Sequence, residues 1–148
     1  MEDHNSPEAV AARANQEDPI VMYLIVRESL GMGVGKTAAQ CAHAAQMLTL
    51  DYIKRVTNTS IDIIDGVNTV GLDPEIKTFK IWLDTSFRKV VLRADDKEWA
   101  KLKFVPNHVV VVDAGLTEIA AGSETVIGIW PMYKSLRPKL IHKLQVLK

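Results

Sequence analysis

The chain of 148 residues is poor in cysteine and has no long hydrophobic run. Its single cysteine, Cys41, has no partner within the chain, which excludes an intramolecular disulfide scaffold and a cysteine zinc site and indicates a reducing compartment. The longest apolar runs, such as 22–26 and 109–112, are far shorter than the roughly 20 residues that span a bilayer. These absences favour a cytoplasmic protein without a membrane-spanning segment.

An excess of charge of one sign is also missing, because 18 Lys and Arg residues balance 18 Asp and Glu residues. The first 18 residues nevertheless hold five acids and a single base, Arg13, which is the reverse of an acid-poor transit peptide, and they have no apolar signal core. We expect residues 1–18 to form a disordered acidic tail and residues 19–148 to form one domain. The small positive balance of that domain does not by itself indicate nucleic-acid binding.

Short apolar segments alternate with segments of helical periodicity. Strands are predicted over residues 20–26, 89–93, 108–112 and 125–130, the last stopped by Pro131. Helices are predicted over 36–54, over 97–103 after a capping box of Asp95 and Glu98, and over a terminal segment marked by Leu136, Leu140, Ile141 and Leu144. Residues 56–78 show no sustained period and are predicted to be a connector.

This alternation predicts an α/β domain with a mixed, mostly parallel sheet of about four strands and helices on both faces. In such sheets, ligands bind beyond the carboxyl ends of the strands. Two polar segments follow strand ends directly, the glycine-rich loop 31–36 and the turn 113–117. We therefore look for chemistry in these two segments.

The glycine-rich loop is similar to a phosphate-binding loop but has the wrong spacing. Three residues separate Gly31 from Gly35, whereas G-x-x-x-x-G-K-[ST] requires four, so a nucleotide hydrolase is a weak alternative. Lys36, Gln40 and His43 share one helix face at positions i, i+4 and i+7. Taken alone, these three residues favour a structural interpretation, in which a solvated lysine lies beside a hydrogen-bonded Gln and His in the interior.

The order and spacing of several motifs resemble the type-two peptidyl-tRNA hydrolase family. They are Gly31-Met-Gly-x-Gly-Lys36-x-Ala-Ala-Gln40-x-x-His43, Asp113-Ala-Gly-x-Thr117 and Gly122-Ser-x-Thr125, and the resemblance runs from about residue 21 to residue 131. The resemblance implies hydrolysis of the ester between a nascent peptide and the terminal ribose of tRNA, without a metal or an organic cofactor. It implies catalytic roles for Lys36, Asp113, Thr117 and Thr125, and substrate-binding roles for Gly33, Gly35, Gln40 and His43.

These residue types suit ester hydrolysis. The Lys36 ammonium can stabilise the negative charge that develops on the carbonyl oxygen, and Asp113 can accept a proton from water or hold Lys36 in place. Thr117 and Thr125 would position the water or the ribose oxygen. Glu118 stands where the family usually has Gln and would raise the pKa of Asp113 if the two side chains were close. Without the resemblance, Asp113 and Thr117 would be read as turn-capping residues.

The C-terminal segment is predicted to contact the tRNA. After Pro131 the chain holds five Lys and Arg residues and no acid, and we assign Lys139 and Lys143 to the phosphate backbone, although a solvated helix face is an equal alternative. Relatives form dimers, so a homodimer is an open expectation, but the periodicity indicates no interface. A non-catalytic RNA-binding or protein-binding module on the same fold is the main alternative function.

Overall fold

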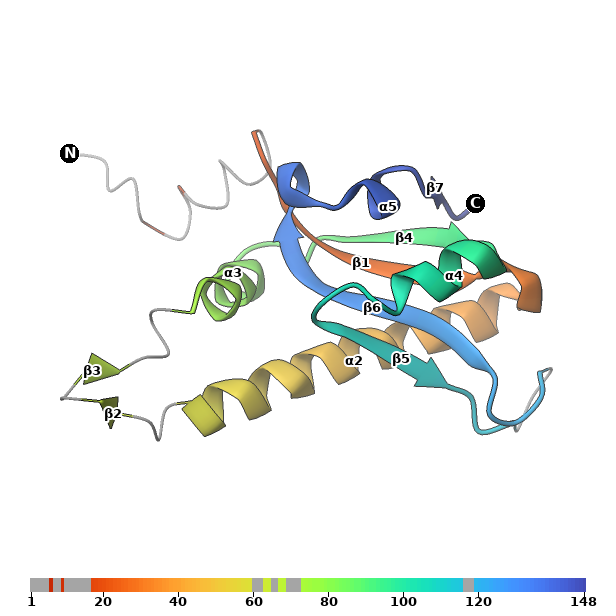
Figure 1. Ribbon diagram of the computed structural model, residues 1–148, viewed down its shortest axis with the longest axis horizontal. Coiled ribbons are helices and arrows are strands. Elements are labelled where there is room, and N and C mark those ends of the chain that lie inside the picture. Colours follow the sequence, from red (N-terminus) through yellow and green to blue (C-terminus); the bar gives the residue numbers. More distant parts are fainter. Residues whose placement is uncertain are drawn as a thin grey trace.

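The computed structural model describes Ser6, Ala9 and residues 17–59, 63–64, 67–68, 73–115 and 119–148. These residues form a central five-stranded sheet with helices on both of its faces and a separate two-stranded hairpin (Figure 1). The predicted acidic tail, residues 1–18, lies almost entirely outside the described residues, so its disorder stays a prediction. None of the described helices combines the length and the apolar character that a bilayer-spanning segment requires.

The sheet is mixed but mostly antiparallel, so the prediction of a mostly parallel sheet of about four strands is wrong. The strands are β1 (Ile20–Arg27), β4 (Lys89–Ala94), β5 (His108–Val112), β6 (Glu124–Tyr133) and β7 (Gln145–Val146), in the order β5-β6-β1-β4-β7. Only β1 and β4 pair in parallel. A parallel pair needs a long crossover, which the helical segment between β1 and β4 supplies, whereas β5 and β6 follow one another in the chain and pair as antiparallel neighbours.

The longest helix, α2 (Val34–Thr59), extends beyond the predicted 36–54 at both ends. It therefore takes the first residues of the predicted connector 56–78, and α3 (Pro74–Leu83) takes the last. The Asp73 side chain caps α3 by accepting hydrogen bonds from two backbone N–H groups, and Pro74 stands where its missing N–H costs nothing. Between the two helices lie β2 (Ile63–Ile64) and β3 (Val67–Asn68), which pair as a short hairpin.

The capping box of α4 (Asp96–Leu102) is confirmed. The Asp95 carboxylate accepts a hydrogen bond from the Glu98 N–H at 2.8 Å, and the Asp95 N–H donates to the Glu98 carboxylate at 3.0 Å. This signal is local, because Asp95 and Glu98 are only three residues apart in the chain. For this reason the sequence located this helix to within one residue at each end.

Two predictions for the C-terminal region are wrong. Strand β6 continues through Pro131, because the register against β1 shifts between Val21 and Tyr23 and such an irregularity tolerates the missing N–H. The expected terminal helix is only one turn, α5 (Lys139–His142), and the 3-10 turn η3 (Lys134–Leu136) precedes it. Pro138 separates the two, since it cannot sit inside a continuous helix.

Alternate side chains of β1 contact the two halves of the core. One half packs against α2 and α3 and includes Met22, Leu24, Cys41 and Phe79. The other packs against α4 and α5 and includes Tyr23 and Ile25. Cys41 is buried, and burial raises the pKa of its thiol, so it packs as a small apolar group as expected.

Candidate active site

The sheet topology brings the two polar segments to one edge. β1 and β5 both run antiparallel to β6, which lies between them, so their carboxyl ends point the same way and the start of β6 lies at that end. The short 3-10 turn η1 (Glu28–Leu30) and the glycine-rich loop lead from β1 into α2, while Asp113 follows β5 directly. Residues from early and late in the chain therefore meet where α2 begins (Figure 1).

Lys36 and Asp113 form a largely buried ion pair at this edge. The Lys36 Nζ donates to Asp113 Oδ1, and the two side chains are 12% and 4% exposed. Lys36 lies in the first turn of α2, where the helix dipole disfavours a cation, and the Asp113 carboxylate compensates for this effect. The hydrogen bond from Lys36 is the main reason that the pKa of Asp113 lies below its usual value. Asp113 is therefore held as a carboxylate.

The Asp113 carboxylate is oriented by its own turn. The Gly115 N–H donates to Asp113 Oδ2 at 2.6 Å, and the Asp113 backbone exchanges hydrogen bonds of 2.9 Å with Ser123 and Gly122. Gly115 has φ +78°, and a Cβ there would lie 2.4 Å from the Cβ of Ala121. Only glycine fits this position, since a side chain would meet both backbone strain and a clash. The sequence predicts a turn after Asp113, but the sequence analysis missed the hydrogen bond from the Gly115 N–H to the carboxylate. The Asp-x-Gly spacing is the signal that could have indicated it.

Behind the ion pair, Gln40 and Thr125 form a buried chain of hydrogen bonds. The Thr125 hydroxyl donates to Gln40 Oε1 at 2.6 Å, and the Gln40 amide reaches Asp113 Oδ1 at 3.5 Å. Thr125 is 0% exposed and Gln40 is 4% exposed. Both side chains therefore lie where they can orient Asp113. Thr125 is fully enclosed, whereas Gln40 also lines the cavity in front of the ion pair.

In front of the ion pair lies a cavity of about 500 Å³, which we call the Lys36–Asp113 cavity. Its walls come from the first turns of α2 and the end of β5, with Gly35, His43 and Val112 among the lining residues. His43 is exposed, and its charge adds to the lowering of the Asp113 pKa. A second hollow continues from His43 and Val112 along the groove between α2 and β5.

The remaining predicted site residues lie elsewhere or are not described. Gly33 is exposed just before α2. Lys139 and Lys143 are exposed at α5, on the face of the sheet opposite α2, and the structure does not bring them to the ion pair. Thr117 and Glu118 lie outside the described residues. Across the described part of the chain, no three potential metal ligands come together.

Comparison with known proteins identifies the family. The family described as "Peptidyl-tRNA hydrolase PTH2" matches residues 20–147. The chain is 33% identical to "Peptidyl-tRNA hydrolase 2" of Saccharomyces cerevisiae, over 84% of this chain and 57% of the yeast protein, and 36% identical to "Probable peptidyl-tRNA hydrolase 2" of Schizosaccharomyces pombe, over 83% and 54%. It thus spans little more than half the length of these two relatives. It is also 32% identical to "Peptidyl-tRNA hydrolase" of Sulfurisphaera tokodaii, over 85% of this chain and 97% of that protein. By this match over nearly its whole length, the chain belongs to the peptidyl-tRNA hydrolase PTH2 family.

Proposed function

We propose that this protein hydrolyses the ester bond between a peptide and the terminal ribose of tRNA, and so releases free tRNA and free peptide. The observation that carries the proposal is the buried Lys36–Asp113 ion pair at the wall of a cavity large enough for the end of a substrate. Family membership supports it, because the relatives named above are peptidyl-tRNA hydrolases.

In this proposal Lys36 stabilises the transition state. Attack of water on the ester carbonyl places negative charge on the carbonyl oxygen, and an ammonium fixed in a largely water-excluded site stabilises that charge. The ion pair with Asp113 keeps the ammonium in position before substrate arrives, so little reorganisation is needed. The peptide then leaves as a carboxylic acid, and the proton from water passes to the ribose oxygen.

Asp113 orients the attacking water. A carboxylate has about four acceptor positions. The described residues fill three of them, with donors from Lys36, Gln40 and the Gly115 N–H. The fourth can accept a hydrogen bond from water. Because the pKa of Asp113 is lowered, it is a weak base, so we assign it to orienting the water and holding Lys36 rather than to removing a proton alone.

Gln40 and Thr125 act as positioning residues behind Asp113. The burial of Thr125 supports this role for its hydroxyl. Gln40 also lines the cavity, and we keep the substrate-binding role that the resemblance implies for it. Gly35 and His43 line the cavity, and Gly33 is exposed just before α2; we keep all three as substrate-binding residues. Thr117 is retained as a catalytic residue on the family motif alone.

Lys139 and Lys143 would bind tRNA phosphates remote from the ester, since they lie on the other face of the sheet. We also keep two expectations with the proposal: that the protein acts in the cytoplasm and that it forms a homodimer. Light scattering of the purified chain tests the second.

The deciding experiment is release of tRNA from purified peptidyl-tRNA, with and without EDTA. We expect turnover that chelation does not change, and a loss of about 100-fold to 1,000-fold in kcat for Lys36→Ala and for Asp113→Asn. The matched control is Lys80→Ala, which breaks an exposed ion pair with Asp84 and should leave the rate unchanged. Variants at Lys36 and Asp113 with wild-type rates would overturn the proposal, and tight tRNA binding without release would favour a non-catalytic binding module.

A further inference from the structure

The C-terminal segment forms an arch over the face of the sheet opposite α2. At one end, the Lys134 N–H donates to the Pro19 carbonyl at 2.8 Å, and the Ser135 N–H donates to Asp18 Oδ1 at 2.9 Å. At the other end, β7 pairs with β4 and the Leu147 N–H donates to the Val91 carbonyl at 3.0 Å. We call residues 134–147 the C-terminal arch. Both of its ends are tied to the sheet, so its position is defined by backbone hydrogen bonds.

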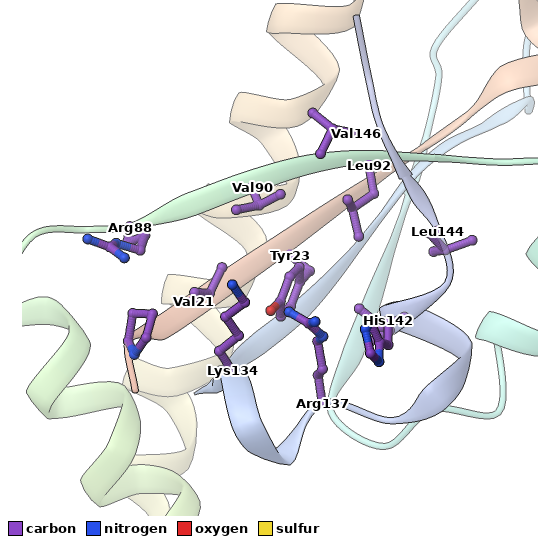
Figure 2. A pocket seen from close by; sticks show the side chains of 12 residues that line it. Val21, Tyr23, Arg88, Val90, Leu92, Lys134, Arg137, His142, Leu144 and Val146 are labelled. Atoms are coloured by element: carbon purple, nitrogen blue, oxygen red, sulfur yellow. The ribbon is translucent and has the colours of Figure 1, made fainter. Parts of the chain in front are cut away.

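Beneath the arch lies a pocket of about 320 Å³, which we call the arch pocket. Its volume is at the lower end of the roughly 300–1,000 Å³ of small-molecule sites. Figure 2 shows its floor, made by β1 and β4, with apolar side chains from Val21, Val90 and Leu92. Such a floor can bury the apolar or planar body of a small ligand.

Basic side chains of the arch line the same pocket. Lys134, Arg137 and His142 come from the arch itself, and Arg88 lies at the edge, directly before β4 (Figure 2). None of the twelve lining residues, all of them described, is acidic. No ion pair within the described part of the chain uses Lys134, Arg137 or His142. Lys134 and Arg137 therefore bring positive charge to the pocket that no carboxylate in the described part of the chain neutralises.

The Tyr23 side chain provides an independent observation. Tyr23 is 3% exposed, and its side chain lines the arch pocket with the hydroxyl on the side of Lys134 and Arg137 (Figure 2). Among the described residues, the Tyr23 hydroxyl has no hydrogen-bond partner. Every buried side-chain polar atom of the described residues has a partner, so the Tyr23 hydroxyl is open to the pocket and not enclosed in the core. The unused donor faces a space already lined by cations.

We propose that the arch pocket binds the phosphate of a nucleoside monophosphate unit. The groups that face the anion are all able to donate: a planar guanidinium fork, an ammonium, an imidazole and a phenol. A phosphate monoester presents several terminal oxygens and matches this set, while the apolar floor takes the nucleoside. The same chemistry is offered by a free mononucleotide and by a phosphate-bearing nucleotide at the end of an RNA. The proposal does not depend on the hydrolysis proposed above.

The test is an NMR titration of the full chain with AMP, with adenosine as the probe that lacks the phosphate. We expect AMP to shift amide signals of β1, β4 and the arch, and adenosine to bind at least tenfold more weakly. Arg137→Gln and Lys134→Gln should each weaken AMP binding about tenfold, and Tyr23→Phe about threefold to tenfold. Lys97→Gln, an exposed lysine on α4, is the charge-matched control and should leave the affinity unchanged.

Two further arms complete the design. An RNA oligonucleotide with a terminal phosphate that displaces AMP identifies RNA as the source of the nucleotide, and failure to displace it identifies the free mononucleotide. AMP titration of Lys36→Ala separates this proposal from the hydrolysis, because binding should persist there whatever happens to turnover. Equal AMP affinity in wild type, Arg137→Gln and Tyr23→Phe would overturn the proposal, as would shifts confined to other parts of the protein.

Discussion

The Lys36–Asp113 cavity and the arch pocket lie on opposite faces of one sheet, and they differ in how their charges are paired. In the first, the ammonium meets a carboxylate and the buried polar atoms behind it are hydrogen-bonded to one another. In the second, the described residues supply cations and a tyrosine hydroxyl but no anion. A paired charge can be held in one geometry for a reaction, whereas Lys134 and Arg137, which form no ion pair with a described residue, are suited to an anion that comes from outside.

The largest expected effect comes from a substitution that distorts the Lys36–Asp113 site and leaves the arch pocket unchanged. Gly115→Ala should cost about 2–4 kcal/mol of unfolding free energy, because it combines positive φ with a side-chain clash, and should greatly reduce hydrolysis. AMP binding by the folded fraction should not change. Denaturant titration and activity assays check this expectation.

The matched control for that substitution is Gly122→Ala. Gly122 has φ +82°, but a Cβ there would meet no atom within 4 Å. The difference between the two variants isolates the clash at Ala121 from the backbone strain. Equal losses would show that the close approach at Gly115 does not matter.

The next effect concerns the buried hydrogen bonds behind Asp113. Thr125→Val leaves Gln40 Oε1 without its donor, which should cost about 1–3 kcal/mol of stability and lower kcat about tenfold, with little change in KM. Thr49→Val serves as the control, because the Thr49 hydroxyl only donates to the Ala45 carbonyl within α2. A change in KM alone would instead indicate that Thr125 touches the substrate.

A smaller effect is expected from pH. Because the pKa of Asp113 is lower in the folded protein than in the unfolded chain, its ionisation stabilises the fold above the unfolded pKa, near 4. That contribution should fall away as the pH drops through the folded value. Urea denaturation between pH 7 and pH 3 should show a smaller loss in Asp113→Asn than in the wild type. Identical pH profiles would contradict the assigned shift.

The smallest effect on stability is expected for Lys80–Asp84, which is also a Lys–Asp ion pair but is exposed to solvent. Lys80 and Asp84 are joined at 2.7 Å, but their side chains are 67% and 52% exposed. Replacing either residue by alanine should change the unfolding free energy by no more than about 0.5 kcal/mol. A larger change would show that burial does not account for the difference between the two pairs.

The predictions that depend on nearby residues succeeded, and those that depend on distant segments failed. The strand at the start of the domain, the capped helix α4 and the helix after the glycine loop were all predicted, since periodicity and caps are signals within a few residues. The predicted direction of strand pairing was wrong, because pairing depends on how segments far apart in the chain come together. The terminal helix was wrong because Pro138 and the pairing of β7 with β4 divide a segment whose leucine spacing favours one helix.

The candidate site shows the same division. The sequence by itself placed Lys36, Gln40 and His43 on one helix face and marked Asp113 at a strand end, because both depend on local geometry. Only the tertiary structure joined Lys36 to Asp113, buried Thr125 behind them and placed Tyr23 beneath the arch. The physical reason is that helix faces and turns are determined by neighbouring residues, whereas burial and charge pairing arise only when the sheet brings together segments far apart in the chain.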